Sequence, residues 1–430
     1  MNERERVLNK IMWRIVPLLF IGAIFAHLDR VNVGMAALQM NADVGLSPST
    51  YGLGVGAFFI VYAVFEIPSN VWLARFGARR WLGRIMFTWG IVSISSIFIS
   101  GQHSFVANRL LLGAAEAGYL PGALVYLSGW LPESHRARAY ALFLMAIPLA
   151  NVIGGPLATV MLGMNGWLGL RGWQWLFLLE GIPPLLLSVL MLKLLRERPA
   201  EAEWLDRNEA AIVADALAGT ATHSERRIRV ADMMHMILKP RILLFTAVVG
   251  CMGGINQAVT FWLPQVIKSF GVTTTQTGWA AAVPYLLGVV AIVYWARHSD
   301  RSGEKKWHLM VPAVCAGLAL VCAVAIPTAV GRFACISAAM TFVFAFQAVF
   351  WSAVAAALQG AERYVGMATV SAGGLLLSFL APYAIGLSKQ ATGSFNAAFL
   401  ILGVMGVVGG GLALVMAGYG LKPMKASADR

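Results

Sequence analysis

Residues 15–37 read IVPLLFIGAIFAHLDRVNVGMAA, an apolar stretch long enough to cross a bilayer, yet Asp29 and Arg30 stand side by side within it. A second pair of ionisable residues, Arg109 and Glu116, lies inside another long apolar stretch. An ionisable side chain at membrane depth costs about 2.5–3.5 kcal/mol or more on insertion scales, and it usually faces a cavity or a partner. These four residues therefore indicate a membrane protein that moves a charged solute.

The composition of the whole chain excludes a soluble globular protein. Of its 430 residues, 59% are hydrophobic and only 12% are charged, whereas soluble proteins carry about 25% charged residues. The apolar spans lack the alternation of a membrane β-barrel, so they predict an all-α protein embedded in a lipid bilayer. The net charge of +13 is spread over short loops and forms no basic domain, so we expect no nucleic-acid partner.

Twelve transmembrane helices are predicted, six on each side of one long polar segment. The first six cover 14–37, 51–74, 82–100, 105–130, 138–164 and 172–195. The second six cover 241–267, 276–298, 309–327, 331–358, 364–390 and 396–420. The predicted domains are an N-terminal six-helix half at 1–195, a cytoplasmic linker at 196–240 and a C-terminal six-helix half at 241–430.

Basic residues are unevenly divided between the two sets of loops. The N-terminal segment, the long linker and the loops after the second, fourth and eighth spans carry most of the Lys and Arg residues outside the spans. The other loops hold one basic residue each or none. Because cytoplasmic loops of membrane proteins are enriched in Lys and Arg, we expect both termini and the linker in the cytoplasm.

The two halves contain related loop sequences. Residues 70–81 (NVWLARFGARRW) follow the second span, and residues 296–307 (ARHSDRSGEKKW) follow the eighth, which is the second span of its half. A shift of 226 residues aligns Arg75 with Arg301 and the final tryptophans with each other. Parallel repeats of six spans are a known transporter design, in which the substrate binds near the midplane between pseudo-symmetric halves.

These loops resemble the gating motif of the major facilitator superfamily, roughly Gly-x-x-x-Asp-Arg-x-Gly-Arg-Arg/Lys. The first copy departs from the motif, because Asn70 and Ala74 occupy the Gly and Asp positions. The resemblance therefore implies unequal gating contacts in the two halves. The residues that match the motif are Arg75, Gly77 and Arg79 in the first copy and Asp300 and Arg301 in the second.

Within that superfamily the chain resembles the anion:cation symporter family over nearly its whole length. Residues 28–34 (LDRVNVG), 109–122 (RLLLGAAEAGYLPG), 172–181 (GWQWLFLLEG) and 392–396 (TGSFN) carry the resemblance. It is nearest to bacterial permeases for aromatic or dicarboxylic acids, such as 4-hydroxyphenylacetate, phthalate or tartrate. The resemblance implies a major facilitator fold in the bacterial inner membrane and a small organic anion as the substrate.

Arg30 and Arg109 are the candidate anion-binding residues. The arginine side chain keeps its charge when buried, and its planar fork matches a carboxylate with two parallel hydrogen bonds. The alternative is a structural ion pair with Asp29 or Glu116. The resemblance points to anion binding.

Asp29 and Glu116 are the candidate proton carriers. Burial favours the neutral form of a carboxyl group and a nearby Arg favours the charged form, so such a group can change protonation as a cavity opens and closes. Neighbouring residues on a helix differ by about 100° in direction, so Asp29 and Arg30 can face different surroundings. The alternative is that both acids are fixed counter-ions that never titrate.

Tyr62 and polar residues of the second half are candidate substrate contacts. Amides and aromatic rings suit the hydroxyl groups or the ring of an organic acid. The alternatives are an interhelical hydrogen bond for amides such as Gln347 and simple packing for the aromatic rings. The candidate set comprises Tyr62, Asn256, Gln257 and Trp351.

No sequence motif points to an enzyme. The chain contains no nucleotide-binding loop, no His-Glu-x-x-His and no Gly-x-Ser-x-Gly, and its four cysteines lack metal-binding spacing. We therefore expect no catalytic residues, no metal and no cofactor beyond the coupling proton. The predicted function is proton-coupled uptake of a small organic carboxylate by a monomeric secondary transporter that works by alternating access. The alternative is an exchanger of organic anions that uses the same arginines.

Overall fold

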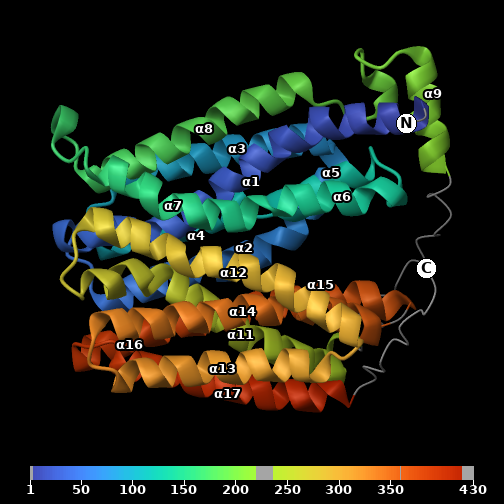
Figure 1. Cartoon of the computed structure of the whole chain (residues 1–430). Helices are drawn as coiled ribbons and strands as arrows, with labels where there is room; N and C mark the ends of the chain where they lie inside the picture. The colour runs from blue at the N-terminus through green and yellow to red at the C-terminus, as the bar shows by residue number, and fades with distance from the viewer. Residues whose placement is uncertain (1–2, 219–235, 359, 419–430) are drawn as a thin grey trace.

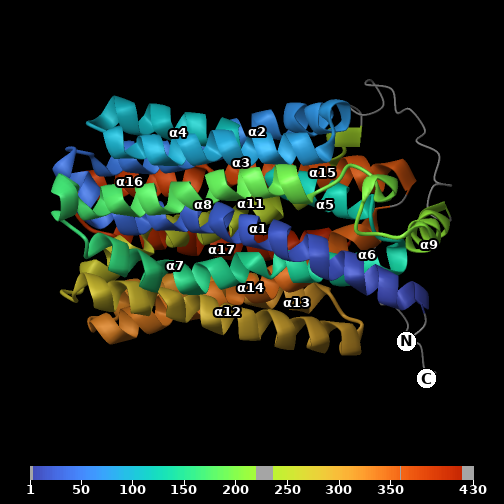
Figure 2. The same cartoon turned by 90° about the horizontal axis from the view of Figure 1, so that it is seen from above.

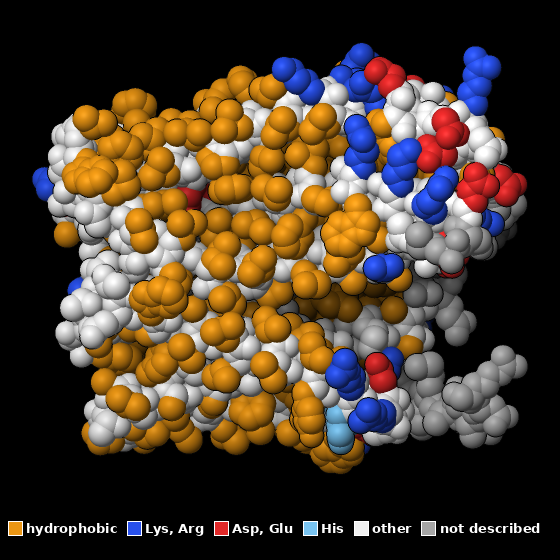
Figure 3. Space-filling model, turned by 45° about the horizontal axis from the view of Figure 1, so that its top comes forward, with side chains coloured by type: hydrophobic (Ala, Val, Ile, Leu, Met, Phe, Trp, Pro, Cys, Tyr) orange, Lys and Arg blue, Asp and Glu red, His pale blue; other side chains and the backbone are white. Residues whose placement is uncertain are grey.

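The computed structural model describes residues 3–218, 236–358 and 360–418, and helices make up nearly all of this part of the chain (Figure 1). Twelve helical stretches in these residues are long and apolar enough to cross a membrane. Each overlaps one of the twelve predicted spans, so the predicted all-α membrane fold is confirmed. Hydrophobic side chains cover the side of the bundle, as a surface facing lipid requires (Figure 3).

Three of the twelve spans consist of two consecutive α-helices, namely the fourth, the fifth and the eleventh, and the third ends in a short 3-10 helix, Ser96–Phe98. The first half contains α1 (Glu3–Asp43), α2 (Pro48–Phe76), α3 (Ala78–Ser95), α4 (Gln102–Glu116), α5 (Tyr119–Ser128), α6 (Glu133–Leu144), α7 (Ala146–Leu162) and α8 (Gly172–Leu194). The second half contains α11 (Pro240–Lys268), α12 (Thr274–Ser302), α13 (Lys306–Ala325), α14 (Ala329–Ala357), α15 (Gly360–Ser378), α16 (Leu380–Thr392) and α17 (Asn396–Ala417).

The two halves lie side by side, with α1 to α8 above α11 to α17 in the view of Figure 1. Seen from above, the helices of both halves run along one common axis (Figure 2). Helix α1 begins at the end of the bundle where α9 (Arg207–Ala218), a part of the predicted linker, also lies. Charged side chains gather at this end in Figure 3, and we call it the basic end. The exact domain boundaries stay a prediction.

An ion pair links α9 to the first helix at the basic end. Lys10 Nζ of α1 donates to Glu209 Oε2 of α9 at 2.6 Å. The Lys10 ammonium holds the pKa of the Glu209 carboxyl below its usual range, because the hydrogen bond favours the charged form. This contact fixes α9 against the first half.

At the opposite end of the bundle, the halves contact each other through glycines. A Cβ atom on Gly155 of α7 would collide with the backbone oxygen of Gly278 of α12, so only glycine permits this approach. A Cβ atom on Gly52 of α2 would lie 2.6 Å from the backbone oxygen of Pro382 of α16. We call this end, where main chain meets main chain, the closed end.

A hydrogen bond between the halves lies beside these glycine contacts. The hydroxyl of Tyr51 in α2 donates to the backbone oxygen of Phe261 in α11 at 3.0 Å. Both residues are buried. The closed end is therefore joined by close packing and by hydrogen bonding.

Candidate functional site

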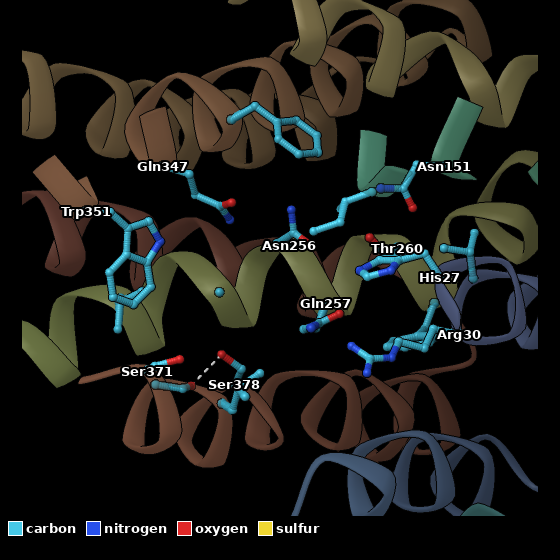
Figure 4. Close-up of a pocket in the computed structure, with 18 residues that line it drawn as sticks. His27, Arg30, Asn151, Asn256, Gln257, Thr260, Gln347, Trp351, Ser371 and Ser378 are labelled. Carbon is cyan, nitrogen blue, oxygen red and sulfur yellow. Dashed lines mark hydrogen bonds between the residues drawn. The ribbon is translucent and has the colours of Figure 1, made fainter. Parts of the chain in front are cut away.

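A polar cavity of about 270 Å³ lies between the two halves (Figure 4). Its walls come from α1, α7, α11, α14 and α15. On α11 the lining runs from Val249 to Phe261, so the cavity extends from the closed end toward the basic end. The polar side chains and the tryptophan of this lining are His27, Arg30, Asn151, Asn256, Gln257, Thr260, Gln347, Trp351, Ser371 and Ser378.

Several cavity residues were not among the candidate site residues chosen from the sequence. Asn151, Thr260, Ser371 and Ser378 line the cavity beside the candidates Asn256, Gln257 and Trp351. Thr260 follows Gln257 by three residues, and Ser378 follows Ser371 by seven, so each pair shares a helix face. This helical spacing was the signal that the sequence offered. A helix face that lines a cavity and a face that packs against another helix show the same spacing, so the signal does not separate them.

Arg30 and Glu116 form an ion pair at the wall of the cavity, with Glu116 fully buried and Arg30 partly exposed. Arg30 Nη2 lies 2.5 Å from Glu116 Oε1, and Arg30 Nε donates to the same oxygen at 2.8 Å. The guanidinium carbon of Arg30 also lies 4.6 Å from the centroid of the Tyr62 ring and 5.4 Å from the centroid of the Phe58 ring. Tyr62 is thus placed against Arg30, and the aromatic faces support the cation.

The backbone of the fourth span is irregular directly after Glu116. Glu116 is the last residue of α4, and the fourth span breaks there before α5 begins at Tyr119. Gly118 adopts a left-handed conformation with φ 91° and ψ −1°. Ser69 Oγ of α2 donates to the backbone oxygen of Ala117 at 2.8 Å, which supplies a partner to a carbonyl at the break. The charged residue therefore sits at a discontinuity of its helix.

Replacing Gly118 by Ala is expected to lower the thermal stability of the purified protein. A side chain at this φ costs about 1–3 kcal/mol, and the new Cβ would collide with Ser69 Oγ. Thermal unfolding in detergent measures the effect. Gly45→Ala is the matched control, because Gly45 has φ 65° with nothing within 4 Å of an added Cβ. A loss no larger than that of the control would contradict the role of the Ser69 contact.

Asp29 faces away from the cavity, although its neighbour Arg30 lines it. Its carboxylate accepts hydrogen bonds from Ser93 Oγ at 2.7 Å and from Trp89 Nε1 at 3.4 Å, both on α3. The side chain is fully buried. Asp29 is therefore held at the interface between α1 and α3.

Arg109 and Glu180 extend the buried charges of the first half. Arg109 Nη2 donates to Asn108 Oδ1 at 3.2 Å, and a second cavity of about 10 Å³ is lined by both Arg109 and Arg30. Asn32 of α1 donates to Glu180 Oε1 of α8. Glu180 Oε2 and Arg109 Nε have no hydrogen-bond partner among the described residues. Three buried acids, the buried Arg109 and the partly buried Arg30 thus occupy one region of this half.

The loop motif of the first half contacts the start of the linker. Gly77 has φ 87° between α2 and α3, and an added Cβ would lie 2.5 Å from Glu197 Oε1. The backbone nitrogen of Arg79 donates to Glu197 Oε2 at 3.3 Å, and Arg79 Nε donates to the Leu192 backbone oxygen at 2.8 Å. The guanidinium carbon of Arg75 lies 5.6 Å from the centroid of the Phe76 ring. The motif therefore joins the second and third spans to the sixth.

The second copy of the motif ends α12. Asp300 and Arg301 occupy exposed positions in its last turn, and Gly303 caps the helix with φ 65°. Next to them, His298 Nδ1 lies 2.7 Å from His308 Nε2. No group of three His, Cys, Asp or Glu residues in the described ranges could hold a metal ion.

Comparisons with known proteins agree with this architecture. A sequence model of the Major Facilitator Superfamily matches residues 19–351. A putative tartrate transporter of Agrobacterium vitis is 38% identical over 97% of this chain and 92% of its own. A putative metabolite transport protein, NicT, of Pseudomonas putida is 36% identical over 91% of this chain and 90% of its own.

Solved structures share the fold at low sequence identity. A bacterial homologue of the human lysosomal transporter Spinster superimposes with a TM-score of 0.80 at 16% identity, covering 97% of this chain and 99% of the other. A D-xylose–proton symporter gives a TM-score of 0.73 at 16% identity, covering 93% of this chain and 97% of the other. These likenesses show the fold.

Proposed function

The chain belongs to the Major Facilitator Superfamily, and on this premise we propose that it takes up a small organic carboxylate together with protons across the bacterial inner membrane. It is a multi-pass membrane transporter and not an enzyme. In this proposal it acts as a monomer, uses the proton as its coupling ion, and works by alternating access of the two halves.

The observation that carries the proposal is the single guanidinium at the cavity wall. Of the described residues that line the cavity, Arg30 alone is Lys or Arg. Its Nε atom donates to Glu116 Oε1, while Nη2 lies close to that oxygen without a hydrogen bond of good geometry among the described residues. A substrate carboxylate is the acceptor that this fork fits best. Arg109 is a second candidate because it shares the smaller cavity with Arg30.

The charge balance of the first half is the reason to expect that protons are bound together with the substrate. With all five groups ionised, the acids Asp29, Glu116 and Glu180 outnumber the cations Arg30 and Arg109 by one. A bound carboxylate adds another negative charge to this region of low polarity, where unbalanced charge is costly. Protonation of Glu116 removes one negative charge and releases Arg30 from its partner. Substrate and proton therefore strengthen each other's binding, as linkage requires.

Glu116 is the favoured proton carrier because it contacts the cavity arginine directly. Asp29 stays in the proposal as a second carrier, although its hydrogen bonds to α3 place it behind the cavity wall. Neutral side chains at the cavity, Asn256, Gln257 and Trp351, would contact the remainder of the substrate. The names of two relatives include tartrate, an organic acid with two carboxylates, which supports a carboxylate substrate.

An exchanger that swaps one anion for another would use the same arginine. The two mechanisms differ in whether a pH gradient alone drives accumulation. The buried acid that contacts Arg30 favours symport, because a simple exchanger needs no titratable partner for its cation.

The test is uptake into proteoliposomes that contain the purified transporter. We first select acids by thermal-shift screening against a panel of aromatic, sugar and dicarboxylic acids, and then supply one of them outside. An outward-acidic pH gradient is expected to drive accumulation above equilibrium, and a protonophore is expected to abolish it. Uptake that occurs only against a preloaded anion would establish the exchanger. Stabilisation by none of the acids and transport of none of them would overturn the proposed substrate class.

A further inference from the structure

Another cavity, of about 260 Å³, lies at the closed end of the bundle and has no part in the proposed cycle. Its walls come from the ends of α11 and α16 and from the starts of α14 and α17, all in the second half. A Cβ atom on Gly386 of α16, one turn before Lys389, would collide with the backbone oxygen of Pro48. The cavity therefore adjoins the contacts that close the bundle, opposite α9 in Figure 1, and we call it the outer cavity.

Two positively charged side chains line the outer cavity, Arg332 of α14 and Lys389 of α16. Both are half-buried, and none of the described residues that line the cavity is Asp or Glu. Another cation of the closed end does have a counter-ion, because Arg171 Nε lies 3.8 Å from Asp43 Oδ2. The outer cavity thus holds two positive charges without a carboxylate of the described chain between them.

The hydrogen-bond donors of the outer cavity are largely unused by the protein. Lys389 Nζ makes no hydrogen bond and no ion pair with a described residue. Arg332 Nε donates to the backbone oxygen of Ile326 at 2.7 Å, which holds the guanidinium in place, while neither Nη atom donates to a described residue. The side-chain amide of Asn396 lines the same cavity and also lacks a described partner. Ammonium, guanidinium and amide donors are therefore available to a ligand.

Lys389 also contacts the aromatic residues at the closed end. Its Nζ atom lies 4.0 Å from the centroid of the Phe395 ring and 5.6 Å from that of Trp262. Trp262 Nε1 donates to the backbone oxygen of Pro382 at 3.1 Å, and its ring packs edge-on against Tyr51 at 4.9 Å between centroids. Tyr51 forms the hydrogen bond between the halves. The outer cavity is thus close to a contact that must break when the transporter opens outward.

We infer that the outer cavity is a second binding site for a small carboxylate, separate from Arg30, which holds the anion before the closed end opens. Guanidinium and ammonium groups form charge-assisted hydrogen bonds with carboxylates, and a positive cavity raises the local concentration of anions. Because the basic end is expected in the cytoplasm, the closed end faces the exterior, from which the substrate arrives. The inference rests on the proposed function for the class of anion.

The test measures how fast Lys389 is labelled by reductive methylation, read out by mass spectrometry on the full-length protein in phosphatidylcholine nanodiscs. Succinate, benzoate and gluconate are each added at increasing concentration. At about ten times its Kd, a bound acid is expected to slow the labelling of Lys389 about tenfold. Lys268, exposed at the end of α11 and outside the cavity, is the control in the same sample and should keep its rate. Equal slowing of Lys268, or equal protection of Lys389 by chloride, would overturn a carboxylate site.

Arg332→Gln tests whether both cations hold the anion. It is expected to raise the acid concentration needed for protection of Lys389 about tenfold, because one charge-assisted hydrogen bond is lost. Arg332→Lys keeps the charge and is expected to restore most of the affinity. Unchanged protection in Arg332→Gln would overturn the two-cation site. If Arg332→Gln does not fold, the wild-type measurement decides, since absence of protection there refutes the site by itself.

Three further arms separate the outer cavity from the transport site and from lipid. Arg30→Gln combined with Glu116→Gln should leave the protection of Lys389 unchanged, and its loss would trace the effect to the transport site and overturn the inference. Slow labelling in phosphatidylglycerol nanodiscs without any acid would assign the cavity to a lipid headgroup and also overturn it. Uptake of an acid that never protects Lys389 overturns the outer site while transport stands. Protection without uptake of any acid overturns the proposed function and supports the outer site.

Discussion

Glu116→Gln is expected to abolish substrate accumulation driven by a pH gradient while substrate counterflow continues. The amide keeps the size of the side chain and an oxygen that can accept from Arg30 at the position of Oε1. It cannot take up or release a proton, so the gradient no longer acts through this residue. Substrate affinity should also become nearly independent of pH, because Arg30 no longer faces a competing carboxylate.

The experiment compares gradient-driven uptake and counterflow in the same proteoliposomes. Glu133→Gln is the matched control, because it makes the same change at an exposed position at the start of α6. The control should accumulate substrate as the wild type does. Full gradient-driven accumulation by Glu116→Gln would show that another group carries the coupling proton. Asp29 would then be the next candidate.

Arg30→Ala is expected to reduce uptake by on the order of a hundredfold and to destabilise the protein. The uptake loss follows from removing charged hydrogen bonds to the substrate, which contribute about 1.5–3 kcal/mol each. The stability loss follows because Glu116 would keep a buried charge without its partner, a change that costs about 3–5 kcal/mol. Uptake rates and thermal unfolding measure the two effects separately.

A double variant separates transport from folding in this test. Arg30→Gln combined with Glu116→Gln removes both charges, so it should recover most of the stability and none of the uptake. Arg138→Ala, an exposed arginine of α6, is the control for loss of positive charge. Near-normal uptake by the stable double variant would remove Arg30 from the binding site and leave Arg109 as the candidate.

The arrangement of the spans could be predicted from the sequence, because hydrophobic length and loop charge are local properties. All twelve predicted spans overlap helices of the structure. The apolar stretch around Asp29 and Arg30 also indicated a site, since ionisable residues at membrane depth are costly. These signals need no knowledge of how the helices pack.

The partners of the charged residues could not be chosen from the sequence. Glu116 was an alternative partner for either arginine, and the choice of Arg30 depends on how α4 packs against α1 and α2. The break after Glu116 was also missed, because residues 105–130 read as one apolar span. Gly118 and Pro121 were its local signs, and both residue types are common in membrane helices for other reasons.

The glycine contacts of the closed end stabilise one conformation of the transporter at rest. Where Gly155 meets Gly278 and Gly52 meets Pro382, the contact is made by backbone and depends on shape. Dispersion forces at such a contact are not screened by dissolved ions, unlike attraction between surface charges. The resting conformation should therefore be nearly the same at low and at high salt concentration. Binding of the substrate carboxylate to Arg30 would then be the event that reverses it.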